Sequence, residues 1–220
     1  MSVDLSTQSV RITEVFCSIQ GEAITVGLPT VFVRLTGCPL RCNYCDTAYA
    51  FQGGQMDTFS AIIEKVSAFN VRHVTVTGGE PLAQKACYAL LALLCDSGYQ
   101  VSLETSGALP IDSVDARVSI VMDLKTPSSG EVRRNLWENL HHIKKADQIK
   151  CVIANRIDYD WVRFQMDQYQ LTKRVDHLLL SPSHGVLSAT DLAEWILADR
   201  LPVRLQIQLH KYLWGDAKGR

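Results

Sequence analysis

Seven short segments of the chain are rich in aliphatic and β-branched residues, and segments with helical periodicity separate several of them. Apolar runs of this length and composition predict β-strands. The predicted strands are Val31–Leu35, Val71–Thr77, Tyr99–Glu104, Val118–Asp123, Gln148–Ile153, His177–Ser181 and Val203–Leu209.

Helices are predicted between these strands from apolar stripes and capping residues. Thr58 suits the N-cap of a helix whose apolar side carries Ile62, Val66 and Phe69. A second helix ends near Gly98, a residue favoured just after a helix C-terminus. Its stripe consists of Cys87, Leu90, Leu91 and Leu94, and two further helices are predicted over Asp158–Gln170 and Thr190–Asp199.

The alternation of strands and helices predicts the fold class. Repeated β-then-α units form a parallel sheet with right-handed crossovers. A closed barrel of eight such units typically needs about 250 residues, and this chain has 220. We therefore predict one α/β domain over residues 1–220, with a partial, open parallel β/α barrel.

Polar residues alternate with apolar ones in several predicted strands. The polar sets are His73, Thr75 and Thr77; Gln100, Ser102 and Glu104; and Arg204, Gln206, Gln208 and His210. If the apolar faces meet the helices, these sets line the interior of the barrel and predict a polar ligand there. Alternatively, a polar face is exposed to water at a sheet edge, which suits the last strand best.

The sequence feature that points most directly to a functional site is a group of three cysteines, Cys38, Cys42 and Cys45, with the spacing C-x3-C-x2-C. Three such thiolates can bind one four-iron cluster and leave one iron open to a small molecule. Zinc remains an alternative, although zinc sites usually add a second cysteine pair or histidines. The scattered Cys17, Cys87, Cys95 and Cys151 are interpreted as small hydrophobic residues.

Composition limits the partners and the location. The formal net charge is −1, so no global attraction to nucleic acid or anionic lipid is expected. No apolar run reaches membrane-spanning length. Seven cysteines without a recognisable signal peptide argue against a disulfide framework. We expect a cytoplasmic protein with no nucleic-acid or membrane partner.

The cysteine loop follows the first predicted barrel strand, at the end where barrel enzymes place active sites. With this spacing, and with Tyr44 before the third cysteine, it resembles the radical S-adenosylmethionine (SAM) superfamily. The resemblance implies that Cys38, Cys42 and Cys45 hold a 4Fe–4S cluster. It also implies that the amino and carboxylate groups of S-adenosyl-L-methionine chelate the fourth iron.

Later segments match the cofactor site of the same superfamily. The turn Thr77–Pro81 (TGGEP) resembles its glycine-rich turn, where the missing Cβ atoms allow the backbone to approach a ligand closely. The alternative is an ordinary strand-to-helix turn. The implied cofactor contacts are Tyr44, Gly78, Gly79, Glu80, Glu104, Ser106, Asp123, Lys125 and Lys150.

A narrower resemblance, to the 7-carboxy-7-deazaguanine synthases, extends over nearly the whole chain. It is carried by Ile12–Ala23, Phe32–Cys38, Cys45–Thr47, Asp123–Gly130 and Gln206–Leu213. The family implies ring contraction of 6-carboxy-5,6,7,8-tetrahydropterin to 7-carboxy-7-deazaguanine with loss of ammonia, in queuosine or deazapurine biosynthesis. It also implies Mg2+, a homodimer and a low-potential reductant, flavodoxin-like or other. The N-terminal extension would bind substrate, and the C-terminal strand would complete the site.

The resemblance also implies roles for individual residues. A pterin needs hydrogen-bonding groups at its ring edge and a cation for its carboxylate. Arg34 would bind the carboxylate, and the alternative for Arg34 is a structural ion pair. Thr47 would bind Mg2+ and is preferred to the neighbouring Asp46 for this role. The remaining implied substrate contacts are Ile19, Gln20, Gly21, Glu22, Thr77, Gln208 and His210. No side chain is expected to replace the cofactors as the source of radical chemistry.

Three rival functions share some of these features. A glycyl-radical-enzyme activase would share the cluster loop and the partial barrel but would not need the Gln20 and Arg34 contacts. A non-catalytic iron–sulfur or other metal-binding protein would explain the cysteines but not the glycine turn. Direct modification of tRNA fits less well with the nearly neutral charge.

Overall fold

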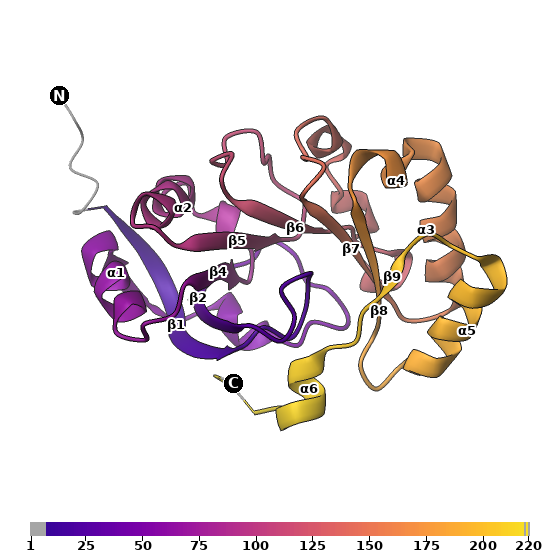
Figure 1. Cartoon of the computed structure of the whole chain (residues 1–220), viewed down its shortest axis with the longest axis horizontal. Coiled ribbons are helices and arrows are strands. Elements are labelled where there is room, and N and C mark those ends of the chain that lie inside the picture. Colours follow the sequence, from indigo (N-terminus) through magenta and orange to yellow (C-terminus); the bar gives the residue numbers. More distant parts are fainter. Residues whose placement is uncertain (1–7, 218, 220) are drawn as a thin grey trace.

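The structure is a computed structural model that describes residues 8–217 and 219. Its centre is one nine-stranded sheet with the order β3-β1-β2-β4-β5-β6-β7-β8-β9 (Figure 1). The strands are β1 (Ser9–Ile19), β2 (Pro29–Leu35), β3 (Gln55–Thr58), β4 (His73–Gly78), β5 (Gln100–Thr105), β6 (Ser119–Asp123), β7 (Gln148–Ile153), β8 (His177–Pro182) and β9 (Arg204–Leu205).

The sheet is parallel from β2 through β9 and antiparallel where β1 pairs with β2 and β3. In the described part of the chain β3 and β9 form its two ends, so the sheet does not close into a barrel. The predicted α/β fold with an open parallel barrel is therefore confirmed.

The longer helices lie along the outside of this sheet, whereas the C-terminal helix lies apart from it near the C-terminus (Figure 1). They are α1 (Phe59–Ser67), α2 (Cys87–Asp96), α3 (Arg156–Tyr169), α4 (Leu171–Arg174), α5 (Ala189–Asp199) and α6 (Leu209–Trp214), with short 3-10 helices at Ala48–Phe51, Pro81–Ala83, Pro127–Ser129, Val132–Arg134 and Trp137–His141. The predicted helices are confirmed to within two residues, and Thr58 Oγ1 accepts the Ala61 N–H as expected of a cap. None of the described helices is long and apolar enough to span a membrane.

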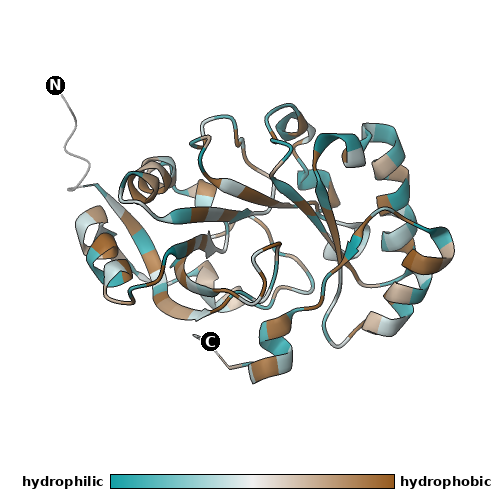
Figure 2. Cartoon of the chain, in the orientation of Figure 1, coloured by the Kyte–Doolittle hydropathy of each residue, from teal (hydrophilic) through white to brown (hydrophobic). Residues whose placement is uncertain are grey.

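Strand alternation separates an apolar outer face from a polar inner face. Val31, Val33 and Leu35 of β2 are fully buried in the hydrophobic core, whereas Thr75 and Thr77 of β4 make hydrogen bonds on the opposite face. Figure 2 shows hydrophobic and hydrophilic residues mixed along the strands, with α2 largely hydrophobic and α3 largely hydrophilic. The predicted polar interior is therefore present on β4 and β5.

Two strands were not predicted, and the reason is local. In β1 the pairing with β2 shifts register between Ile12 and Glu14, so the residues that face the core change phase within the strand. Val10 and Ile12 are buried before the shift, and Val15 packs against the core after it. A pattern that changes phase does not show a single period of two. The second missed strand, β3, has only four residues.

Two predictions about element ends are wrong. The last strand, predicted over Val203–Leu209, contains only Arg204 and Leu205, because the chain then turns toward the loop after β1 and starts α6 at Leu209. The Leu209 N–H donates to the Gly21 carbonyl at 3.0 Å and so fixes this departure. Phe69 lies beyond the end of α1 and is 40% exposed, so it does not belong to the buried stripe.

Side chains at the start of α3 bind the loop after β6 and the loop after β7. Asn155 caps the helix through bonds to the Ile157 and Asp158 N–H groups. Asp158 is fully buried and accepts the N–H groups of Ser128 and Ala154, each at 2.9 Å. One carboxylate therefore satisfies two backbone donors from different loops.

We predict that Asp158→Ala lowers the free energy of unfolding by about 2–4 kcal/mol, because two buried N–H groups lose their acceptor. Asp160→Ala is the control, since its carboxylate on the same helix is 53% exposed and pairs with Arg156 at the surface; that change should cost less than about 1 kcal/mol. Urea unfolding of both variants checks this. Equally small effects in both variants would show that the two bonds to Asp158 do not stabilise the fold.

Candidate functional site

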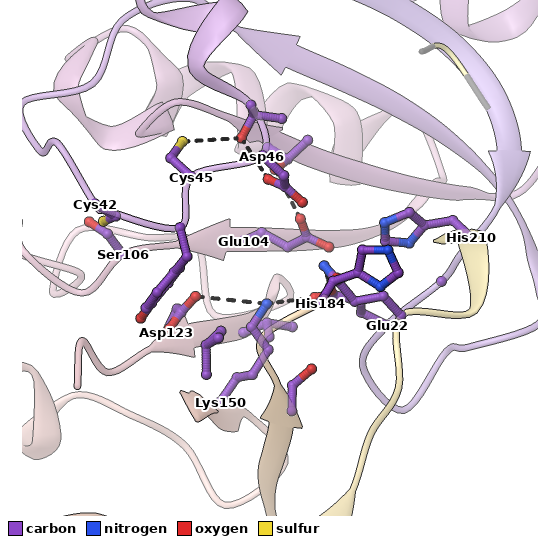
Figure 3. A pocket seen from close by; sticks show the side chains of 18 of the residues that line it. Glu22, Cys42, Cys45, Asp46, Glu104, Ser106, Asp123, Lys150, His184 and His210 are labelled. Carbon is purple, nitrogen blue, oxygen red and sulfur yellow. Dashed lines mark hydrogen bonds and ion pairs between the residues drawn. The ribbon is translucent and has the colours of Figure 1, made fainter. Parts of the chain in front are cut away.

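A cavity of about 530 Å3 opens at the carboxyl ends of the parallel strands, the edge at which the sequence placed the site. In Figure 3, Cys42 and Cys45 lie on one side of this cavity, Glu22, His184 and His210 lie on the other, and Glu104, Asp123 and Lys150 lie between them. Most residues predicted for the site line this one cavity. They include Cys38, Tyr44, Thr47, Gly78, Gly79, Ser106, Lys125, Arg34, Thr77, Ile19, Gln20, Gly21 and Gln208.

The three motif cysteines come from the cysteine loop, Cys38–Cys45, which follows β2. All three line the cavity and are partly exposed. Burial raises the pKa of the Cys38 and Cys42 thiols, while the charge of Lys125 favours the Cys42 thiolate. Among the described residues, no three His, Cys, Asp or Glu side chains could together hold one metal ion. A four-iron cluster does not need such a group, because each thiolate binds a different iron.

The other cysteines have the structural role that was predicted for them. Cys87 and Cys151 are buried in the hydrophobic core, and Cys17 and Cys95 pack against it. The thiols with a candidate chemical role are thus separated in space from those that fill the core.

The glycine-rich turn after β4 packs directly on the cysteine loop. A Cβ on Gly79 would lie 2.4 Å from the Gly37 carbonyl oxygen and 2.7 Å from the Cys38 Cβ, and a Cβ on Gly78 would lie 2.3 Å from the Leu35 carbonyl oxygen. Contacts this short are not possible for a side chain, so both positions require glycine. The close approach that the sequence suggested is therefore an approach to the end of β2 and the start of the cysteine loop, at a turn that also lines the cavity.

Glu80 is a correction to the predicted cofactor contacts. Its side chain is fully buried and accepts bonds from the Leu82 N–H, the Thr105 hydroxyl and both the N–H and the hydroxyl of Ser106. A carboxylate with all these partners inside the protein is held as a structural residue. Glu80 instead fixes the loop after β5, which leaves Ser106 on the cavity wall with its hydroxyl donating to Glu80.

Two lysines and Asp123 form a charged group in the middle of the cavity. Asp123 Oδ2 lies 3.2 Å from Lys125 Nζ and 3.7 Å from Lys150 Nζ. Burial alone would lower the pKa values of both lysines, but the neighbouring carboxylates outweigh it and raise them. The buried Asp123 Oδ1 has no hydrogen-bond partner within the described residues. A buried carboxylate oxygen without a partner can accept a bond from a ligand.

The loop after β1 meets this group through Glu22. Lys150 Nζ donates to Glu22 Oε2 at 2.5 Å, and Gln208 Nε2 donates to Oε1 at 2.9 Å. Burial would raise the pKa of Glu22, but Lys150 and Gln208 outweigh it and lower that pKa to about 2. Lys150, predicted as a cofactor contact, and Glu22, predicted as a substrate contact, are therefore direct partners.

His210 lies against the same loop. A Cβ on Gly21 would be 2.2 Å from His210 Nδ1, so the glycine makes room for the ring. Burial lowers the pKa of His210 while the charge of Glu22 opposes that shift. The ring is therefore held on the cavity wall by α6.

Gln20 has a different role from the predicted contact of its amide with a ring edge. Its Nε2 donates to Thr75 Oγ1 at 3.2 Å and to Glu104 Oε1 at 3.4 Å, and its Oε1 accepts the Glu22 N–H at 3.1 Å. Both amide hydrogens thus have partners inside the protein. Gln20 thus positions Glu22 and Glu104, and it lines the cavity together with Ile19 and Gly21.

Glu104 lies among residues that were assigned to the substrate. Thr77 Oγ1 donates to Glu104 Oε2 at 2.9 Å. Burial and the nearby charge of Glu22 raise the pKa of Glu104, against the opposing charge of Lys150. The structure therefore groups Glu104 with Gln20 and Thr77 rather than with Ser106.

Arg34 lines the cavity and is also ion-paired. Its Nε donates to Glu14 Oε1 at 2.7 Å, and the Tyr49 hydroxyl donates to the same oxygen at 2.7 Å. The ion pair that was considered as the alternative is thus present. It coexists with a position on the cavity wall, from which the guanidinium can reach a ligand carboxylate.

Thr47 and Asp46 lie beside the third cysteine. Thr47 Oγ1 is 3.9 Å from Cys45 Sγ and donates to Asp46 Oδ1 at 3.2 Å. Both residues line the cavity. Their oxygens are hard ligands of the kind that Mg2+ prefers, but too few to bind it without a ligand's own oxygens.

Several residues on the cavity wall were not identified from the sequence. Phe16 and Phe32 are opposite each other on β1 and β2, and their rings stack with centroids 5.1 Å apart. They line the cavity together with Ser183 and His184, which follow β8. The pairing of the two phenylalanines depends on the register of β1, which the sequence pattern did not predict.

Comparison with known proteins agrees with this geometry. Residues 32–147 match the Radical SAM superfamily. A 7-carboxy-7-deazaguanine synthase from Chlorobaculum tepidum is 43% identical over 220 residues, covering 98% of this chain and 100% of that protein. A protein of the same name from Koribacter versatilis is 39% identical over 227 residues, covering 96% and 100%.

Two solved structures share the fold. QueE from Escherichia coli superposes with a TM-score of 0.76 at 23% identity, covering 96% of this chain and 100% of QueE. SuiB from Streptococcus suis, bound to S-adenosylmethionine, superposes with a TM-score of 0.55 at 13% identity, covering 78% of this chain and 45% of SuiB. At these identities the two likenesses show a shared fold.

The Glu22–Lys150 pair leads to a prediction about pH. Because the folded pKa of Glu22 is about 2 and the ordinary value is 4.5, the pair stabilises the fold above pH 4.5 and loses this effect as the pH falls toward 2. The loss between pH 5 and pH 3 should be on the order of 2 kcal/mol. A carbon-13 NMR titration should give a Glu22 midpoint well below 4.5, and Lys150→Met should raise it.

Lys65→Met is the control for this titration, because Lys65 is 42% exposed and pairs with Asp57 instead. It should leave the Glu22 midpoint unchanged. A wild-type midpoint near 4.5 would show that Lys150 does not hold this carboxylate in its charged form.

Proposed function

The chain belongs to the radical SAM superfamily and, within it, to the 7-carboxy-7-deazaguanine synthases, and from this premise we propose how its cavity carries out the reaction. The reaction converts 6-carboxy-5,6,7,8-tetrahydropterin to 7-carboxy-7-deazaguanine with loss of ammonia. The observation that carries the proposal is that one cavity holds three cysteines on one side and a network of buried ion pairs and amides toward the other.

The residues on the cysteine side fit a 4Fe–4S cluster and S-adenosylmethionine. Cys38, Cys42 and Cys45 supply three thiolates, and the unpartnered Oδ1 of Asp123 can accept a bond from a cofactor amino or hydroxyl group. Lys125 can pair with the cofactor carboxylate. When bound, the cluster and S-adenosylmethionine supply the one-electron cleavage that starts the reaction.

The far side of the cavity suits the pterin. Arg34 offers a cation to the carboxylate, while Glu104 can accept hydrogen bonds from ring N–H groups. The stacked Phe16 and Phe32 offer an apolar wall to a flat ring. Gln208 and His210 reach the same space from the C-terminal segment. These groups orient the ring and exclude water, which protects a reactive radical.

Mg2+ is proposed to bind beside the cysteine loop. Thr47 provides one oxygen ligand, and Asp46 is the nearest carboxylate. The substrate carboxylate and waters would complete the octahedral shell. Thr47 would hold the metal in the cavity beside Cys45, where its positive charge would stabilise the substrate carboxylate.

The remaining properties concern the protein in the cell. We propose that it acts in the cytoplasm as a homodimer and receives its electron from a flavodoxin-like or other low-potential donor. A reducing compartment suits thiolates that must stay free to bind iron.

The direct test is turnover by anaerobically reconstituted protein supplied with the carboxypterin, S-adenosylmethionine, Mg2+ and a reductant. Wild type should form 7-carboxy-7-deazaguanine, and Cys42→Ala should form none and hold no cluster. Cys17→Ala should keep both, because Cys17 packs against the core. Unchanged pterin with the wild type would refute the proposed function, and iron loss from Cys17→Ala would show that the ligand set is wrong.

Arg34→Ala separates the two halves of the cavity. It should leave S-adenosylmethionine affinity unchanged and weaken pterin binding by about 10- to 100-fold, the cost of a lost charge-assisted bond. Glu14→Gln is the matched control, because it breaks the same ion pair at Glu14 but keeps the cation. Calorimetric titration of both ligands checks this, and equal losses in the two variants would show that Arg34 acts only through Glu14.

A further inference from the structure

The cysteine loop has little regular structure of its own. β2 ends at Leu35 and the next 3-10 helix starts at Ala48, so the cysteines lie between elements. Within the loop, the Cys45 N–H donates to the Cys42 carbonyl at 3.2 Å, and Arg41 Nη1 donates to the Cys38 and Leu40 carbonyls, each at 2.7 Å. Contacts with the rest of the protein must therefore contribute to its shape.

Contacts on both sides of Cys42 come from one segment, Thr126–Glu131, which we call the clamp turn. The Arg41 N–H donates to Glu131 Oε1 at 2.5 Å. The Asn43 N–H donates to the Ser129 carbonyl at 3.0 Å. The two residues that flank Cys42 are thus both bound, through their backbone, to a turn about 90 positions later in the chain.

The clamp turn is itself firmly held. Thr126 and Ser129 are fully buried. Ser129 Oγ donates to the Thr126 carbonyl at 2.6 Å, and Thr126 Oγ1 donates to the Val152 carbonyl at 2.9 Å. The Ser128 N–H donates a hydrogen bond to Asp158 Oδ1. The turn can therefore transmit the position of β7 and α3 to the cysteine loop.

The geometry of the turn brings Glu131 toward Arg41. Gly130 has φ +76°, a left-handed conformation that favours glycine. A Cβ there would lie 3.2 Å from the side-chain nitrogen Nδ2 of Asn43. The Asn43 Nδ2 donates to the Ser128 carbonyl at 3.0 Å beside it. The Glu131 N–H donates to Ser129 Oγ at 3.0 Å, which fixes the backbone that carries the carboxylate.

We propose that Glu131 is a positioning residue for the iron–sulfur cluster: by accepting the Arg41 N–H it sets where Cys42 presents its thiolate. This inference rests on the proposed cluster site. Groups that orient metal ligands commonly change metal affinity by about 10- to 100-fold when they are removed. The role depends on a hydrogen-bond acceptor and not on a negative charge, since a neutral side-chain amide oxygen can accept the same bond.

Two variants separate the acceptor from the charge. Glu131→Ala removes both, whereas Glu131→Gln removes the charge and keeps an oxygen at the same reach. Glu138→Ala is the control, because Glu138 is an exposed carboxylate a few residues later. If Glu131→Ala fails to fold, Glu131→Met takes its place, because it keeps a side chain of similar length without the carboxylate acceptor, and it should have the same effects.

The first measurement uses cluster-free protein. Amide hydrogen exchange at Arg41 should be about tenfold faster in Glu131→Ala, the result of losing one hydrogen bond. Glu131→Gln and Glu138→Ala should match the wild type. Urea unfolding of the same samples shows whether the change is confined to the loop.

The second measurement uses reconstituted protein and follows iron loss to a chelator. Glu131→Ala should lose iron about 10- to 100-fold faster than the wild type, with an altered electron paramagnetic resonance signal of the reduced cluster, and Glu131→Gln should not. If Glu131→Ala retains iron and amide protection like the wild type, or if Glu131→Gln fails equally, the inference is wrong. A wild type that assembles no cluster overturns the proposed function as well.

Discussion

The largely buried ion pair between Glu22 and Lys150 is the interaction on which the site depends. It joins the loop after β1 to strand β7 across the cavity. Burying two charges costs several kcal/mol per ion unless each has further partners. Gln208 supplies a partner for Glu22, and Asp123 lies near Lys150. The pair is therefore stable only while the N-terminal loop, the barrel strands and the C-terminal segment are in place together.

The loop that carries Glu22 is held from two more directions. The Ala23 N–H donates to Gln206 Oε1 at 2.9 Å, and the Ile24 N–H donates to Gln148 Oε1 at 2.8 Å. Both glutamines are almost completely buried. The Gln206 bond, together with the bond from the Leu209 N–H to the Gly21 carbonyl, holds the chain after β9 against this loop instead of in a longer strand. The loop after β1 and the C-terminal segment thus cover part of the open barrel, and residues of both line the cavity.

The electrostatics of the cavity divide it into two functional halves. Lys125 and Asp123 lie toward the cysteine loop, whereas Glu22, Glu104 and Arg34 lie toward the proposed pterin site. Lys150 belongs to both halves, because it contacts Glu22 and lies near Asp123. The Lys150 ammonium therefore lies between the carboxylates of the two halves, and a charged ligand in either half would act on the same lysine.

Much of this organisation could be predicted from local sequence patterns. The cysteine spacing, the strand alternation and the turn after β4 are encoded within a few residues, and the structure brought most of the predicted site residues to one cavity. What could not be predicted depends on tertiary partners. Glu80 looked like a ligand contact, but its four donors come from Leu82, from the end of β5 and from the loop after it. Gln20 has its amide occupied by Thr75 and Glu104, which are distant in sequence. The strand β1 was missed because a register shift changes the phase of its pattern.

The central claim is that one cavity holds the cleavable cofactor and the pterin side by side. A crystal structure of anaerobically reconstituted protein with S-adenosylmethionine, Mg2+ and the carboxypterin tests it most directly. The account predicts the sulfonium next to a cluster on Cys38, Cys42 and Cys45, and the pterin carboxylate on Arg34. A pterin bound outside this cavity, or a cluster with a fourth protein ligand, would contradict it.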